Sequence, residues 1–367
     1  MAKRTKPPFR ADHVGSLLRT APLKQAREKH AKGEIGDADL KAIEDREIAK
    51  IIRKQEDVGL TSITDGEFRR AWWHLDFLAG LAGAKLVDLE QGIQFKGVQT
   101  RAQGVRVAGP LGFHDHPMIE HFKFVHGHTT KTPKMTIPSP SAMYARHGRL
   151  LVGADVYPSL DTFFDDLGKA YRKAVRAFAD AGCRYLQMDE VYIALWCDPE
   201  HRKALAARGD DADRLLKTYA DLINTAMSDI PSDMTIVMHL CRGNFRSTFM
   251  GTGGYAPVAE TLFGRSNVHG YFMEYDTERA GGFEPLRLVP KGKIVVLGLL
   301  TSKNGKLESK DEIKRRIEQA AKFVDIDQLC LSTQCGFAST EEGNILAEDE
   351  QWAKLRMVVE VADEVWG

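Results

Sequence analysis

Thr235-Ile236-Val237-Met238-His239-Leu240-Cys241 is an apolar run that ends in two side chains able to bind a metal ion. Because successive side chains of a strand alternate between faces, His239 and Cys241 would point the same way at its carboxyl end. Zinc accepts nitrogen and sulfur ligands together and prefers four of them. The run therefore predicts half of a zinc site on a strand, and the site requires two further ligands.

Seven other short β-rich runs end in polar residues, and long segments of helical periodicity separate them. The eight runs are residues 13–16, 62–67, 134–139, 184–189, 235–239, 270–274, 294–300 and 329–333, and the main helical segments are 39–59, 158–182, 210–228, 309–323 and 348–366. Gly182 is expected to end the second of these helices. Strands that alternate with helices favour a parallel sheet, and eight such units predict an α/β fold, the (β/α)8 TIM barrel.

Residues 68–130 interrupt this alternation with many glycines, histidines and aromatic residues of weak periodicity. We interpret them as an insertion after the second strand, a hairpin and a long loop near the barrel mouth. No repeat or linker divides the chain, so residues 1–367 are expected to form one zinc-dependent barrel domain.

Composition narrows the classes of partner. The chain has 51 Lys and Arg against 51 Asp and Glu, which gives no overall attraction to nucleic acid or to anionic membranes. The aliphatic runs are too short to span a bilayer, and the start has no signal-peptide core, so we expect a cytoplasmic protein. Five cysteines, an odd number, argue for reduced thiols that are free to bind metal. The expected partners are small molecules, and a homodimer is left open.

The barrel fold gathers the carboxyl ends of all strands on one face, so ligands can come from distant segments. Glu274 ends the sixth run and Cys335 follows the eighth. His239, Cys241, Glu274 and Cys335 together make a four-ligand zinc site.

Histidine, cysteine and glutamate are also common in purely structural roles. His-X-Cys alone is a weak pattern, and the alternative for Glu274 is a solvated or salt-bridged carboxylate. Cys183, Cys197 and Cys330 are typical core residues. Cys330 is the rival of Cys335, but it lies within the apolar strand. The histidines at 114, 116, 121, 126 and 128 imitate a metal cluster, and we expect them in an exposed loop.

Taken together, these motifs resemble the C-terminal catalytic barrel of the cobalamin-independent methionine synthase family, in a short, single-barrel form. The resemblance includes Gly15-Ser16, Asp65-Gly66-Glu67, Gln187-Met188-Asp189-Glu190, His239-Leu240-Cys241, Glu274 and Cys335-Gly336. It implies zinc on His239, Cys241, Glu274 and Cys335, and homocysteine held by Gly15, Ser16, Glu67 and Asp189.

This ligand set indicates a particular chemistry. Zinc with two thiolates would hold a third sulfur and deprotonate a substrate thiol whose free pKa is about 8.5. Glu274, the hardest donor, is the ligand expected to leave when that sulfur arrives. Glu67 and Asp189 would clamp the substrate ammonium group, with Asp189 thereby serving catalysis, although an ion-pair network lining the barrel is the alternative.

The sequence departs from the family pattern on the side of the methyl donor. Thr301-Ser302-Lys303 stands where the family has Asp-Ile-His-Ser, and Lys303 is our candidate for assisting the leaving group. A glutamate that contacts the pterin in the family is replaced near Leu195, and a family tryptophan falls near Arg146.

The resemblance implies transfer of a methyl group from a methyltetrahydrofolate-type donor to homocysteine, as in 5-methyltetrahydropteroyltriglutamate-homocysteine S-methyltransferase. Two alternatives stay open: alkyl transfer to another thiol, as in epoxyalkane:coenzyme M transferase, and a non-catalytic barrel that binds zinc and a thiol. In the first alternative an anionic group would be held by Arg69, Arg70, Arg242 and Arg246. Trp72, Trp73, His74 and Phe77 form either an aromatic wall over the substrate or simple packing.

Overall fold

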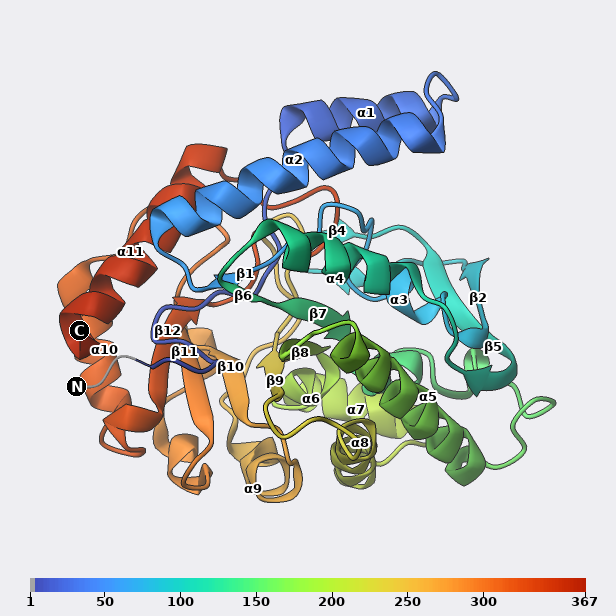
Figure 1. The fold of residues 1–367 in the computed structure, drawn as a ribbon. Coiled ribbons are helices and arrows are strands. Elements are labelled where there is room, and N and C mark those ends of the chain that lie inside the picture. The colour runs from blue at the N-terminus through green and yellow to red at the C-terminus, as the bar shows by residue number, and fades with distance from the viewer. Residues whose placement is uncertain (1–3) are drawn as a thin grey trace.

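Parallel strands form the centre of the molecule, a computed structural model that describes residues 4–367 (Figure 1). Six of them pair in the order β12-β11-β10-β9-β8-β7: β7 (Met135–Pro138), β8 (Tyr185–Glu190), β9 (Thr235–Leu240), β10 (Gly270–Glu274), β11 (Ile294–Leu300) and β12 (Leu329–Thr333). β1 (Ser62–Ile63) pairs with β6 (Thr132–Pro133), which leads directly into β7. The register places Asp189 beside His239, so the polar strand ends share one face as the barrel prediction requires.

The prediction of a regular strand at residues 13–16 is wrong. Among residues 4–367, this first segment pairs with β12 only through a bridge between Ala11 and Leu331. The backbone of Gly15 has φ +129°. A side chain replaces the missing ladder, because Ser62 Oγ donates to Asp12 Oδ1 at 2.7 Å. The barrel is therefore closed between its first two strands by side-chain hydrogen bonds, which strand periodicity cannot reveal.

Asp12 and Lys134 form a fully buried ion pair inside the barrel, with Nζ 3.4 Å from Oδ1. The Asp12 carboxylate also accepts from Tyr185 Oη at 2.8 Å, and Lys134 Nζ donates to His13 O at 2.6 Å. Burial lowers the pKa of Lys134, and the Asp12 charge opposes that shift. These contacts join the segments of the first, third and fourth strands around one carboxylate.

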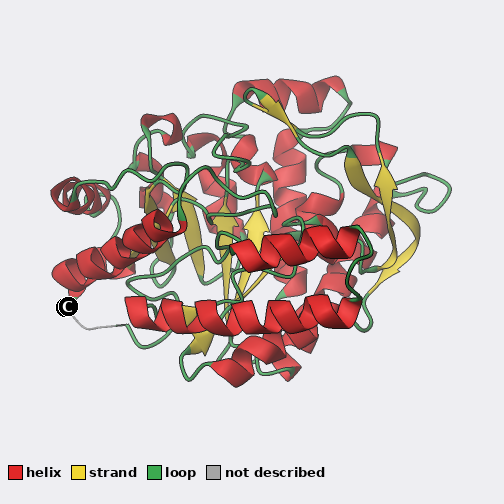
Figure 2. Ribbon diagram, turned by 90° about the horizontal axis from the view of Figure 1, so that it is seen from above, coloured by secondary structure: helices red, strands yellow, loops and turns green. Residues whose placement is uncertain are grey.

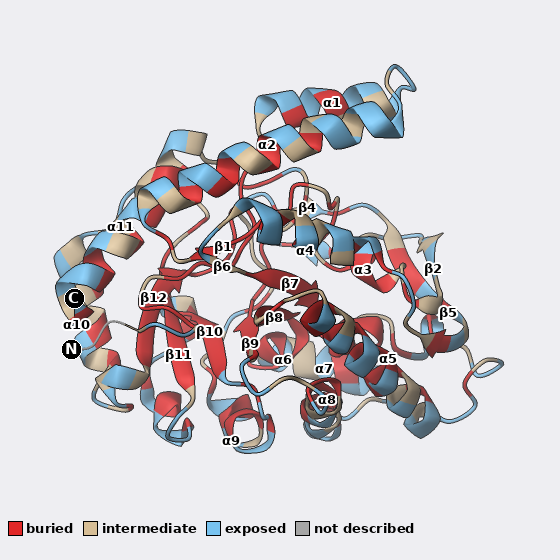
Figure 3. Ribbon diagram, in the orientation of Figure 1, coloured by how far each residue is buried: buried red, intermediate tan, exposed pale blue. Residues whose placement is uncertain are grey.

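Helices surround the strands, as the view from above shows (Figure 2). The strands are buried, whereas the helices carry buried and exposed residues side by side (Figure 3). The longer ones are α1 (Ala21–Ala31), α2 (Asp37–Val58), α4 (Pro117–His128), α5 (Leu160–Asp180), α7 (Pro199–Ala207), α8 (Ala212–Ala226), α9 (Ala256–Arg265), α10 (Lys310–Ala320) and α11 (Glu348–Trp366). Short helical turns are α3 (Leu75–Leu78), α6 (Tyr192–Leu195), η1 (Pro140–Met143), η2 (Gly148–Leu150), η3 (Glu278–Ala280), η4 (Glu284–Leu288) and η5 (Ile326–Gln328). Gly182 follows α5 with φ +96°, as its expected role as a helix stop requires.

The segment 68–130 contains both the anticipated hairpin and an unexpected helix. β2 (Ala82–Asp88) pairs antiparallel with β5 (Gln103–Gly112), and β3 (Gln94–Phe95) pairs with β4 (Val98–Gln99). Helix α4 contacts α2 and α5 and so occupies the place of a barrel helix. The histidines there are not all on an exposed loop, since His116 is buried at the start of α4 and His121, His126 and His128 lie on that helix.

Within residues 4–367, the helices are either too short or too polar to cross a lipid bilayer.

Replacing Lys134 by Met should lower the free energy of unfolding by about 3–5 kcal/mol, because it leaves the Asp12 carboxylate buried without its counter-charge. Denaturant unfolding followed by circular dichroism measures the change. Lys169→Met, at an exposed pair with Asp165, is the control and should be neutral. Equal stability of Lys134→Met and the parent protein would contradict the role of this pair.

Candidate active site

Three of the four predicted metal ligands meet at the carboxyl ends of β9 and β12. One ligand atom each of His239, Cys241 and Cys335 lies within 4.8 Å of the other two, and all three residues are buried. Cys241 Sγ and Cys335 Sγ are 3.6 Å apart. His239 and Cys241 point together because they are two residues apart at the end of one strand, and Cys335 reaches them from the other side of the barrel.

The donor set fits a metal ion. Neither ring nitrogen of the buried His239 has a hydrogen-bond partner, which is costly unless another group satisfies one of them. The sulfur separation is far longer than a disulfide bond, and it is close to the roughly 3.8 Å expected for two thiolates on a tetrahedral zinc. The backbone N–H of Gly243 donates to Cys241 Sγ at 3.3 Å, which fixes the position of that sulfur.

The two thiols differ electrostatically. The hydrogen bond from Cys241 lowers the pKa of Cys335 well below its usual range, in spite of burial, and it raises the pKa of Cys241. The hydrogen bond from Cys241 thus favours the thiolate form of Cys335. A thiolate beside an unpartnered imidazole is a suitable pair of ligands for a soft or borderline divalent ion.

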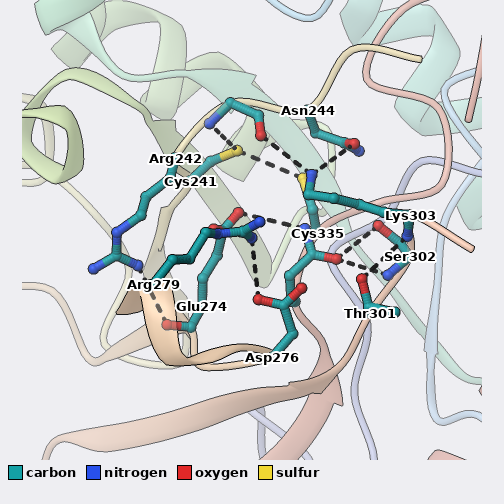
Figure 4. A network of polar contacts seen from close by, with 12 residues as sticks. Cys241, Arg242, Asn244, Glu274, Asp276, Arg279, Thr301, Ser302, Lys303 and Cys335 are labelled. Carbon is teal, nitrogen blue, oxygen red and sulfur yellow. Dashed lines mark hydrogen bonds and ion pairs between the residues drawn. The ribbon is translucent and has the colours of Figure 1, made fainter. Parts of the chain in front are cut away.

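Glu274 ends β10 but is not a member of the three-residue group. Its Oε2 lies 3.2 Å from Arg279 Nη2, and its Oε1 accepts from Gln334 Nε2 at 3.4 Å (Figure 4). Burial raises the pKa of Glu274, while Lys303 and Arg279 act against that shift. The carboxylate thus has an ion-pair partner of its own, which is the alternative role expected for this residue.

A cavity with an empty volume of about 710 Å³, part of it open to solvent, reaches the three converging metal-ligand candidates. Its lining includes His239, Cys241 and Cys335, and also Ser16, Glu67 and Asp189. Six of the residues predicted from sequence therefore face one space. Gly15, Glu274 and Lys303 do not line it.

Glu67 and Asp189 both line this cavity, and the Asp189 charge acts on Glu67. Burial raises the pKa of Glu67 to about 8, Arg70 acts against it, and the Asp189 charge adds to it. Burial also raises the pKa of Asp189, whose Oδ1 accepts from Gln187 Nε2 at 2.8 Å. Two buried carboxyl groups of this kind favour a cation between them.

The Gly15–Ser16 turn is packed tightly against the neighbouring strand ends. A Cβ atom at Gly15 would lie 3.3 Å from Glu67 Oε1, in a backbone conformation that strains any residue but glycine. Ser16 Oγ accepts from the backbone N–H of Ala338 at 3.3 Å, and a Cβ atom at Gly336 would lie 1.9 Å from that oxygen. Ser16 is thus held at the cavity wall between the segments that follow β1 and β12.

The side-chain amine of Lys303 is hydrogen-bonded to the loop that follows β9. Its Nζ donates to Asn244 Oδ1 at 3.1 Å (Figure 4). It also donates to Gly243 O at 3.3 Å and to Thr248 O at 3.2 Å. An ammonium group has three N–H bonds, and each has an acceptor here. Lys303 therefore fastens the loop after β9, which carries Cys241, and has no free proton donor directed at the cavity.

Three of the arginines considered for an anionic thiol already have partners. Arg69 contacts Glu44 and Asp45, Arg70 contacts Glu67, and Arg242 donates to Tyr255 Oη and to backbone carbonyls. For Arg246 the notable feature is a left-handed backbone, with φ 47°.

Of the four residues considered for an aromatic wall, some line the cavity and others only pack against neighbours. Trp72 and Trp73 line the cavity, whereas Phe77 packs against His116 and Tyr171. His74 is buried beside Trp73 with 4.4 Å between ring centroids. Part of the segment after Glu67 is therefore wall and part is packing.

Arg146, Tyr192, Asn244 and the hairpin residues Ile93 and Phe95 also line the cavity and were not among the predicted site residues. Asn244 Nδ2 donates to Gly336 O at 2.8 Å and so ties the loop after β9 to the loop after β12. In the sequence, Arg146 stands out only as a departure from a family position. The others lie in loops whose paths the sequence pattern does not define.

Comparison with known proteins agrees with this geometry. The model of the family "Cobalamin-independent synthase, Catalytic domain" matches residues 9–364. The "Uncharacterized protein YxjG" of Bacillus subtilis is 52% identical over 367 residues, 99% of this chain and 96% of that protein. A 5-methyltetrahydropteroyltriglutamate--homocysteine methyltransferase of Bacillus licheniformis is 26% identical over 96% of this chain, which spans only 42% of that relative.

Solved structures show the same fold. A putative vitamin-B12 independent methionine synthase from Listeria monocytogenes has a TM-score of 0.80 and 44% identity, with 99% of this chain and 100% of that chain covered. A B12-independent methionine synthase from Shewanella sp. W3-18-1, in complex with selenomethionine, has a TM-score of 0.71 at 19% identity, with 97% of each chain covered. The chain belongs to the cobalamin-independent synthase family, as a methionine synthase-like methyltransferase built on the TIM-barrel catalytic domain.

Proposed function

We propose that this protein binds a zinc ion through His239, Cys241 and Cys335 and transfers a methyl group to the thiol of homocysteine, giving methionine. The observation that carries the proposal is the convergence of these three side chains on a cavity that also presents Glu67 and Asp189. Glu274 is the candidate for the fourth ligand, because it ends the strand next to β9. To serve as one, its carboxylate must exchange the Arg279 contact for the metal.

When bound, zinc would supply Lewis acidity that keeps a substrate thiol in its thiolate form at neutral pH. Glu67 and Asp189 then hold the ammonium group of homocysteine, and Ser16 lies beside them at the wall. This arrangement fixes the direction of the sulfur and lowers the entropic cost of meeting the donor. The aromatic side chains of Trp72 and Trp73 exclude water from that space.

The transfer itself is a displacement at carbon. The homocysteine sulfur forms a bond to the methyl carbon while the bond between that carbon and the donor nitrogen breaks. The electron pair stays on nitrogen, which takes up a proton from solvent in place of the one that the thiol released. We propose a methyltetrahydrofolate-type donor, in line with the name of the Bacillus licheniformis relative. For Lys303 we propose a positioning role in place of proton donation, since all its N–H bonds are engaged by the loop.

The experiment that tests the function offers zinc-loaded protein homocysteine with one donor at a time: methylfolate monoglutamate, methylfolate polyglutamate, methylcobalamin and a small epoxide. We expect methionine to accumulate with a methylfolate. Consumption of thiol only with the epoxide would indicate alkyl transfer of another kind, and stoichiometric thiol binding without turnover would indicate a non-catalytic barrel.

Cys241→Ser should lose the bound metal and homocysteine methylation together, because a hydroxyl is a poor ligand in place of a thiolate. Metal content by mass spectrometry and methionine formation measure the two effects. Cys183→Ser is the matched control, since that buried thiol donates to Tyr185 O at 3.3 Å and lies outside the cavity lining. Full activity of metal-free Cys241→Ser would refute the assignment.

Glu67→Gln should weaken homocysteine binding roughly 10- to 100-fold, because a charged hydrogen bond to the ammonium group contributes about 1.5–3 kcal/mol. Calorimetric titration of the zinc-loaded variant gives the dissociation constant, and its metal content should be unchanged. Glu44→Gln, at an ion pair with Arg69 outside the cavity, is the control. Unaltered homocysteine affinity would favour a purely structural carboxylate pair.

Lys303→Met should raise KM and expose the loop 242–251 to proteolysis, while the shape of the pH–rate profile stays the same. The reason is that the loop loses three acceptor contacts but no proton donor. Limited proteolysis and kinetics across pH measure these effects. If the alkaline limb of the profile disappears with the loop still protected, Lys303 is the proton donor after all.

A further inference from the structure

Arg146 is a charged residue without a counter-charge in the wall of the cavity. It lies between η1 and η2, after β7, and no described carboxylate comes within 4.0 Å of its guanidinium. Burial lowers the pKa of Arg146, and Tyr192 acts against that shift. Its backbone carbonyl accepts from Arg208 Nη1 at 2.9 Å, so the main chain here is fixed. A partly buried guanidinium without a partner is unfavourable in the free protein, and an anionic ligand would relieve that cost.

Other arginines near the site contrast with it. Arg70, the remaining arginine of the cavity lining, is paired with Glu67. Arg279, which lies outside the cavity lining, contacts both Glu274 and Asp276. Arg146 is therefore the guanidinium of this cavity that remains available to a ligand.

The surroundings of Arg146 offer no negative charge. Burial lowers the pKa of His74 well below its usual range and that of His147 to about 4, with the Arg146 charge adding to both shifts, so both rings are neutral. Burial raises the pKa of Tyr192 to about 12, so its phenol is also neutral. None of these three neighbours therefore offsets the positive charge of Arg146.

The proposed ammonium clamp has arginine neighbours of its own. Arg70 and Arg19 act on the pKa of Glu67, and Arg70 acts on that of Asp189. Trp72 and Trp73 line the cavity together with Arg146 and provide flat apolar surfaces. Aromatic walls with one guanidinium suit an unsaturated body that carries an anionic group.

We propose that Arg146 binds a carboxylate or phosphate group of the alkyl donor and so selects an anionic donor. This inference rests on the proposed function for the identity of that second substrate. Arg146 takes no part in bond making, in which the sulfur–carbon bond forms and the methyl–nitrogen bond breaks; it positions the donor. The amino-acid carboxylate of homocysteine is the other source of the same chemistry, and the experiment separates the two.

The test uses a matched pair of probes, 4-(methylamino)benzoate and the neutral 4-(methylamino)benzamide, with binding followed by tryptophan fluorescence and saturation-transfer NMR. The parent protein should bind the benzoate at least tenfold more tightly than the amide, and Arg146→Gln should abolish this preference. Arg146→Lys should retain part of it, because the charge stays but the planar fork is lost. Homocysteine affinity of the zinc-loaded protein, measured by calorimetry, should be the same in all variants.

Arg149→Gln is the control, since it removes the same charge from a nearby residue that donates to Tyr157 O and Pro158 O outside the cavity. Circular dichroism and metal content verify the fold of each variant. A benzoate preference that persists in Arg146→Gln, or that is absent from the parent protein, overturns the proposal. Weakened homocysteine binding with an unchanged probe preference would assign Arg146 to the amino acid instead. Probe binding needs no turnover, so failure of the proposed methyl transfer would be seen separately.

Discussion

A buried carboxylate, Asp12, holds the barrel closed where the strand ladder is missing. Ser62, Tyr185 and Lys134 bring hydrogen bonds or charge to it from the second, fourth and third strands. The chain can then leave the extended conformation three residues later, at Gly15. This polar closure is what allows the Gly15–Ser16 segment to form a turn beside the cavity, where a regular strand could not bend.

Closure of the barrel in turn determines the site. The carboxyl ends of β9 and β12 are far apart in the sequence, yet the barrel brings Cys241 and Cys335 within 3.6 Å of each other. The loop after β9 is then held by several contacts, among them those of Lys303 and the Asn244 contact with Gly336. The ligand positions thus depend on the strand framework first and on loop anchoring second.

The sequence predicted those parts of the molecule that follow from periodicity. Strand and helix alternation gave the barrel, and the spacing of His239 and Cys241 gave their common direction. The sequence did not predict which side chains would contact one another. Nothing in the pattern indicates that Asp12 replaces a strand ladder, that Glu274 contacts Arg279, or that loop carbonyls occupy the amine of a lysine, because each contact depends on the path of an irregular loop. Arg146 stood out in the sequence only as a departure from a family position, and its lack of an acidic partner could not be predicted for the same reason.

The proposed chemistry depends most on His239, Cys241 and Cys335 sharing a zinc ion that takes the substrate sulfur as a further ligand. X-ray absorption at the zinc edge of the purified protein, before and after addition of homocysteine, tests this directly. We predict one tightly bound zinc with two sulfur neighbours at about 2.3 Å, increasing to three with homocysteine. An absent zinc, or a sulfur count that homocysteine leaves unchanged, would contradict the proposed role of the metal.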